Sequence, residues 1–315
     1  MINTTTEEPK QYQNRQHPAL QFLSFAAICV GFILAANIIT IGTAAAFYGL
    51  NSVMAISQGN LTAPHVINAL WIIQVMGTTL PIFAAPVFFA YVIVKNTNDY
   101  LKPTIYFPWV LLVLVFCIMF ISSPLIELLS NINAKMVLPH FLSGVQKWMR
   151  ESEDTNQKLM TAMLQMNSFG TMIFDVLVIG LLTGIAEEFM FRGVIQTIFM
   201  RWTKNKHAAI WITAILFSAF HLEFFGFLPR LLLGALFGYF VAWSGSIWPA
   251  VWGHFINNGT AVVATYLYQH KKTTINLDDQ HLFNVQLYIF SFVTVGFLMY
   301  VYRYINLNKK PLPIY

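Results

Sequence analysis

Ionisable and amide side chains occur inside strongly apolar segments in the second half of the chain. In chain order they are Glu187, Glu188, Arg192, His221, His254 and Asn258. A charged side chain at the centre of a bilayer costs about 3 kcal/mol even on the most lenient scales, so such residues within an apolar segment indicate a functional site. The types present include a base, proton carriers and hydrogen-bond donors, and together they suit the hydrolysis of an acyl bond.

The two adjacent glutamates have different surroundings if their segment is helical. Glu188 and Arg192 are four residues apart and share one face of an α-helix, so we expect an ion pair that supports the structure. Glu187 points to the adjacent face and has no local partner. Because burial and a like-charged neighbour both make a carboxylate more basic, we expect Glu187 to act as the general base.

The histidines and the asparagine each have a structural explanation when taken singly. A lone histidine such as His221, near the end of an apolar helix, is more often a hydrogen-bonded helix residue than a catalyst. His254 and Asn258 share a helical face, and such a pair also joins helices through hydrogen bonds. Three polar clusters on successive helices nevertheless favour one shared cavity, because facing lipid is unfavourable for all of them. There, His221 would hold water and relay protons, while His254 and Asn258 would be neutral donors to an oxyanion.

The composition requires a lipid environment for most of the chain. Hydrophobic residues make up 57% of the sequence and charged residues 10%, against about 25% charged in an average soluble domain, and the mean hydropathy is +0.60. Apolar runs occupy about residues 20–48, 66–94, 105–129, 170–190, 208–222, 229–244, 248–268 and 284–304. These runs predict an all-α fold, a polytopic transmembrane bundle of about eight helices around a polar catalytic cavity.

The same scan divides the chain into one domain and two tails. We expect a single membrane-embedded domain over residues 20–304, between a polar N-terminal tail (1–19) and a C-terminal tail (305–315). Within the domain, about 170–268 form the catalytic core. About 130–168 form an interfacial or loop segment, whose amphipathic part we expect to pack on the bundle or the lipid headgroups.

Charges and cysteines limit the classes of partner. The net charge of +5 is spread over short loops and both tails, unlike the concentrated basic face of a nucleic-acid-binding protein, so no nucleic acid partner is expected. Lysines and arginines in the short loops favour cytoplasmic N- and C-termini, with Lys271 and Lys272 counting against this. Cys29 and Cys117 lie inside apolar runs, which indicates neither a disulfide framework nor a zinc knuckle.

The three polar motifs, taken together and in order, resemble those of the CPBP intramembrane proteases, the family that includes the CAAX-processing endopeptidases. They are Glu-Glu-x-x-x-Arg starting at Glu187, Phe-x-x-x-His starting at Phe217 and His-x-x-x-Asn starting at His254. The resemblance covers about residues 180–260. It implies an intramembrane glutamic endopeptidase that needs neither a metal nor another cofactor.

The resemblance also implies a role for each matching residue. Glu187 activates water together with His221, and His254 and Asn258 support the oxyanion. Glu188 and Arg192 match the remaining positions of the first motif and support the site. The implied partners are the membrane lipid bilayer and a peptide or protein substrate with a membrane-associated, extended segment.

Two other functions stay open at this point. A glutamate and two histidines form a known catalytic zinc ligand set, although the chain has no His-Glu-x-x-His sequence on one helix. Alternatively, the polar residues form a scaffold or proton relay in a non-catalytic transporter-like or immunity protein, since relatives of this family are often linked to bacteriocin self-immunity.

A prenylated CAAX substrate is the family's best-known case. We expect a location in the cell (inner) membrane of a bacterium, however, and there another membrane-associated peptide is the better candidate for the substrate.

Overall fold

The computed structural model describes residues 16–274 and 282–307. The predicted tails therefore lie largely outside the described residues. Within the described ranges the chain is entirely helical, without a β-strand, which confirms the predicted all-α fold. The eight apolar runs of the sequence lie largely in helices, with residues 105–109 as an exception, as expected for a protein in which backbone groups within lipid must be hydrogen-bonded internally.

Five helices among the described residues are long and apolar enough to cross a membrane, and they identify the chain as an integral multi-pass membrane protein. They are α1 (Pro18–Tyr48), Val66–Ile93, Phe169–Thr203, Phe224–Ser244 and α15 (Val285–Leu307). A sixth span arises if α6 (Val110–Ile121) and α7 (Ser123–Ala134), which meet at a bend of 43°, count as one. Pro124, which has no N–H to donate to the preceding turn, lies at the bend.

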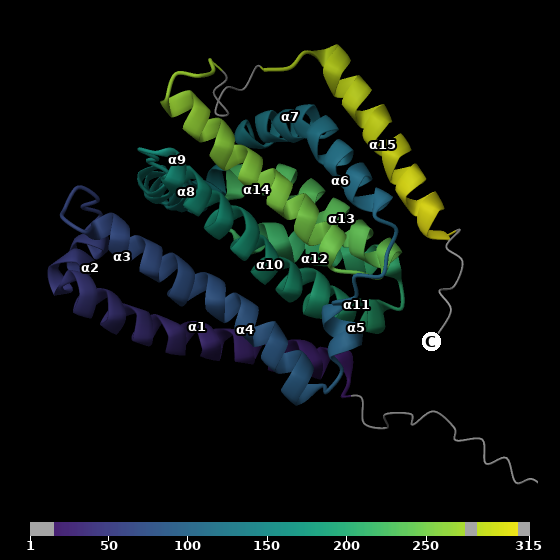
Figure 1. The fold of residues 1–315 in the computed structure, drawn as a ribbon, viewed down its shortest axis with the longest axis horizontal. Helices are drawn as coiled ribbons and strands as arrows, with labels where there is room; N and C mark the ends of the chain where they lie inside the picture. Colours follow the sequence, from purple (N-terminus) through teal and green to yellow (C-terminus); the bar gives the residue numbers. More distant parts are fainter. Residues whose placement is uncertain (1–15, 275–281, 308–315) are drawn as a thin grey trace, which may run out of the picture.

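The other two predicted runs form helices that do not meet this measure. The first, α12 (Lys206–Phe220), has only 15 residues. The second, α14 (Trp248–Gln269), has 22 residues, but His254, Asn257 and Asn258 make it less apolar. A helix with this composition is stable in a membrane only among other helices, and α14 does lie in the centre of the bundle (Figure 1).

The spans enclose the polar motifs between two outer layers. In Figure 1, α1 lies beside the helix that contains α3 (Val66–Ile72) and α4 (Leu80–Phe88) on one side, and α15 lies against α6 and α7 on the other. Between them pack Phe169–Thr203, α12, α13 (Phe227–Ser244) and α14. Each of these four helices contacts at least one of the others closely.

Two glycines let α13 approach its neighbours closely. A Cβ atom at Gly234 would lie 3.1 Å from Ala214, and one at Gly238 would lie 2.8 Å from Ile210 and from Gln196. Glycines four residues apart form the small-residue stripe that brings membrane helices together. This approach fixes α12 and α13 against the glutamate helix.

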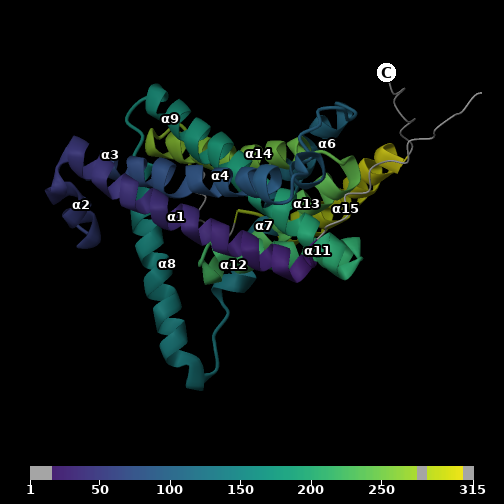
Figure 2. The same ribbon diagram turned by 90° about the horizontal axis from the view of Figure 1, so that it is seen from below.

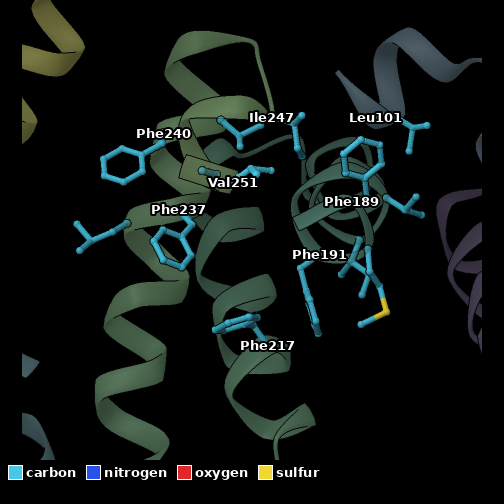
Figure 3. Close-up of a cluster of buried hydrophobic side chains, with 14 of the residues drawn as sticks. Leu101, Phe189, Phe191, Phe217, Phe237, Phe240, Ile247 and Val251 are labelled. Carbon is cyan, nitrogen blue, oxygen red and sulfur yellow. The ribbon is translucent and has the colours of Figure 1, made fainter. Parts of the chain in front are cut away.

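Aromatic side chains fill the space between the central helices. Phe217 from α12 and Phe237 and Phe240 from α13 are fully or almost fully buried beside Phe191 of the glutamate helix, and Figure 3 shows all four in one cluster. The Phe191 and Phe217 rings meet edge to face with centroids 5.1 Å apart, a favourable aromatic geometry. This cluster forms the apolar surroundings of the ionisable residues.

The segment predicted to be interfacial contains one long polar helix. After η3 (His140–Leu142), α8 (Ser143–Met163) projects away from the bundle, as Figure 2 shows. The C-terminal end of α8 is fixed to the bundle, because Met163 belongs to a buried apolar cluster with Val66 and Leu70 of α3. Its other face carries the exposed i,i+4 pair Lys147–Glu151.

Candidate active site

The two glutamates lie in a regular α-helical stretch flanked by π-helical turns. Within Phe169–Thr203, α10 (Thr183–Glu188) follows η4 (Val176–Leu182) and precedes η5 (Phe189–Ile195). Such wider turns inside a helix are frequent at functional sites, because they rotate the side chains that follow. Glu187 is 8% exposed and Glu188 is fully buried.

The ion pair predicted from helical spacing is present. Arg192 Nη1 donates to Glu188 Oε1 at 2.7 Å, and both side chains are completely buried. Arg192 Nη2 donates to the carbonyl of Gly234 at 3.0 Å. Its guanidinium also lies over the rings of Phe217 and Phe237, 4.3 Å and 5.2 Å from their centroids. These contacts compensate a charge that burial would otherwise make very unfavourable.

Glu188 has a second partner that the sequence did not predict. His254 Nδ1 lies 2.9 Å from Glu188 Oε1. An ionised carboxylate only accepts hydrogen bonds, so His254 donates its Nδ1–H to Glu188. Its Nε2 then faces Glu187. Glu188 thus holds both Arg192 and His254 in place.

Glu187 lies between the two histidines. Its Oε2 is 3.7 Å from His221 Nε2 and 3.8 Å from His254 Nε2, and this buried oxygen has no hydrogen-bond partner. His221 Nδ1 lies 2.9 Å from the Phe217 carbonyl, which only accepts, so His221 also presents Nε2 to Glu187. Both distances exceed a direct hydrogen bond, so the two histidines face Glu187 without bonding to it directly.

Asn258 is near this group without being hydrogen-bonded to it in the described part of the chain. Its Nδ2 donates to the carbonyl of Ile179 at 3.3 Å, and its Oδ1 accepts from Asn257 Nδ2 at 3.1 Å. Asn258 lies one helical turn beyond His254 on α14. Convergence is therefore direct for Glu187, His221 and His254, whereas Asn258 lies at the edge of the group.

Aromatic rings fix the orientation of both histidines. Phe237 stacks on His254 with centroids 5.3 Å apart, and Phe217 meets His221 and His254 edge-on at 5.0 Å and 6.0 Å. Phe217 belongs to the motif Phe-x-x-x-His. Phe237 carries no signal in the sequence, because its role depends on how α13 packs against α14.

Comparison with known families bears on this arrangement. Residues 169–260 match the family described as type II CAAX prenyl endopeptidase Rce1-like. This part of the chain is an Rce1-like domain. The domain contains Glu187, Glu188, Arg192, His221 and His254, and the buried Glu/His cluster is consistent with a catalytic site. No curated protein and no solved structure matches the chain.

Proposed function

We propose that the protein is an intramembrane glutamate-dependent endopeptidase that hydrolyses a peptide bond of a membrane-associated substrate. The observation that carries this proposal is the unpartnered Oε2 of Glu187, which faces Nε2 of both His221 and His254. A carboxylate and two imidazoles arranged in this way hold a water molecule and accept its proton. Membership of residues 169–260 in a family of endopeptidases supports the same reaction class.

Charge balance suggests the protonation state of the resting site. Glu187 and Glu188 carry two negative charges when ionised, and Arg192 supplies one positive charge to this buried group. One further proton makes the group neutral, which a medium of low dielectric favours. We place this proton on His254 Nε2, so that His254 is a charged donor and not the neutral one expected from the sequence, because its Nδ1–H is already directed at Glu188 and Glu187 then stays ionised as the base.

The reaction follows from these positions. Glu187 takes a proton from water as the water oxygen bonds to the carbonyl carbon of the substrate, and the carbonyl oxygen becomes an oxyanion. His254 Nε2–H and an Asn258 Nδ2–H donate to that oxyanion. Such stabilisation of the developing charge is usually the largest single contribution to lowering the barrier. The C–N bond then breaks, and the proton held by Glu187 passes, with His221 as relay, to the leaving nitrogen. The products are a carboxylic acid and an amine, and the acid then gives its remaining proton to the amine, so that they leave as a carboxylate and an ammonium group.

We propose that this activation needs no metal ion. The residue types would suit zinc, but no group of three His, Cys, Asp or Glu side chains within the described ranges has the geometry of a metal site. The proposal assigns to Glu187 the work that a metal would otherwise do, namely the generation of a nucleophile from water.

The test is a comparison of peptide termini in membranes of cells that contain the wild type, Glu187→Ala or the control Glu151→Ala. Glu151 is an exposed glutamate on α8, with 65% of its side chain accessible, so the control removes a carboxylate outside the site. We expect a set of new termini that depends on Glu187 and is unaffected by the control. Identical termini in all three samples would contradict proteolysis and favour a non-catalytic role.

A further inference from the structure

A cavity of about 630 Å³ lies between α7, α14 and the segment that follows α12. Its volume lies within the range of small-molecule sites, so it is large enough to take a long side chain. Apolar side chains line much of it, including Phe225 and Ile256. The polar lining includes Glu127, Glu153 and Asn257, and no lysine, arginine or histidine of the described residues is part of it.

Glu127 is the unusual member of this lining. It lies in the bent pair α6–α7, which is long and apolar enough for a span, and no ion pair joins it to a basic side chain of the described residues. Its Oε1 accepts from Tyr288 Oη at 2.7 Å, whereas its buried Oε2 has no hydrogen-bond partner. A carboxylate within a membrane segment normally has a partner, and one that lines a cavity without a counter-ion indicates that a ligand supplies the cation.

Glu153, the second carboxylate of the lining, is already engaged. It accepts from the backbone N–H of Phe225 at 3.1 Å, and the guanidinium of Arg150 lies 3.9 Å from the centroid of the Phe225 ring. Burial is the main cause that raises the pKa of Glu153, so this carboxyl is less available as a negative charge. Glu127 is therefore the group that selects the charge of a ligand.

Two residues that line the cavity lie close in the chain to candidate active-site residues. On α14, Asn257 lines the cavity and donates to Asn258, one turn beyond His254. After α12, Phe225 lines the cavity four residues beyond His221. Asn257 and His254 lie within one turn of α14, and a turn rises only about 5.4 Å, so the cavity is placed to receive a side chain of a residue near the bond being cleaved.

We propose that this cavity is a specificity pocket that takes a basic side chain, lysine or arginine, of the peptide substrate, with Glu127 as its counter-charge. The apolar walls contact the methylene groups of such a side chain, and Asn257 offers a further hydrogen bond near its head. The inference rests on the proposed peptidase function, and it names the substrate class as peptides with a basic residue beside the scissile bond.

Binding to a non-cleaving variant separates this pocket from the chemistry. Glu187→Gln protein in lipid nanodiscs is titrated with two fluorescent, membrane-associated peptides that differ only in lysine or norleucine at one position, scanned along the sequence. Loss of a hydrogen bond to a charged group corresponds to about 10- to 100-fold in affinity. We expect the lysine peptide to bind at least about tenfold more tightly at one position, and Glu127→Gln to remove that preference. The control Glu151→Gln makes the same change at an exposed site and should leave it intact.

Each result bears on one claim. Equal affinity for the two peptides at every position, or a lysine preference that persists in Glu127→Gln, would overturn the pocket assignment. The peptide comparison stands alone if Glu127→Gln fails to fold, because it uses unchanged Glu127. If the wild type cleaves none of the peptides although the lysine preference depends on Glu127, the pocket stands and the proposed peptidase function fails.

Discussion

Replacement of Arg192 by methionine should destabilise the protein strongly, because it leaves Glu188 buried without its cation. The two side chains are 2.7 Å apart and fully buried, and removal of one partner from such a pair costs about 3–5 kcal/mol. Methionine retains much of the apolar volume beside Phe217, which limits the contribution of a new cavity. For a chain of this size, about 1 kcal/mol corresponds to roughly 2 °C in Tm, so we expect a fall of roughly 6–10 °C.

A double substitution shows whether the stranded charge is the cause. In Glu188→Gln/Arg192→Met the pair is neutral, and the introduced glutamine still offers an oxygen to His254, so the loss should shrink to about 1–2 kcal/mol. Lys147→Met serves as the control, because its i,i+4 pair with Glu151 is exposed and 3.7 Å long, and such pairs contribute less than about 1 kcal/mol. Thermal unfolding of the purified proteins in detergent measures these three variants together with the single variant Glu188→Gln. A wild-type Tm for Arg192→Met, or additive losses in the double variant, would refute the reasoning.

Three further outcomes follow from the structure. His254→Ala and Asn258→Ala should each lower kcat by about 10²-fold with little change in peptide binding; equal losses in binding would remove their assignment as oxyanion donors. Exhaustive chelation should leave peptidase activity unchanged, whereas loss that added Zn²⁺ restores would show a metal mechanism. Burial, reinforced by Arg201, lowers the pKa of Lys102 to about 8, so the folded state favours the neutral amine. The free energy of unfolding should therefore rise with pH between about 8 and the usual lysine pKa of 10.5, and a Tm that rises equally in Lys102→Met would contradict this.

The sequence predicted those parts of the site that depend on one helix alone. The Glu188–Arg192 pair follows from a spacing of four residues, and the face that Glu187 occupies follows from the same geometry. The near approach of both histidines to Glu187 was inferred from the unfavourable energy of facing lipid. This kind of inference identifies which residues lie close together, but it does not identify the atoms that are in contact.

Contacts that depend on how helices rotate against one another were not predictable. The hydrogen bond from His254 to Glu188 and the stacking of Phe237 on His254 arise from the packing of α13 and α14, and the π-helical turns around α10 change the register of the side chains that follow. The position of Glu127 was not predictable either, because the apolar run at about 105–129 predicted a single helix. The bend beside Pro124 is what begins the separate helix α7, and α7 brings Glu127 to the cavity.

The central claim is that Glu187 is the general base, and the turnover number of Glu187→Gln on a cleaved peptide tests it most directly. Glutamine keeps the shape of the side chain and removes its basicity, and Glu187 Oε2 makes no hydrogen bond that the substitution would break. We predict that purified Glu187→Gln keeps the wild-type Tm and binds the peptide, with hydrolysis reduced to background. Substantial hydrolysis by the folded Glu187→Gln protein would contradict the account.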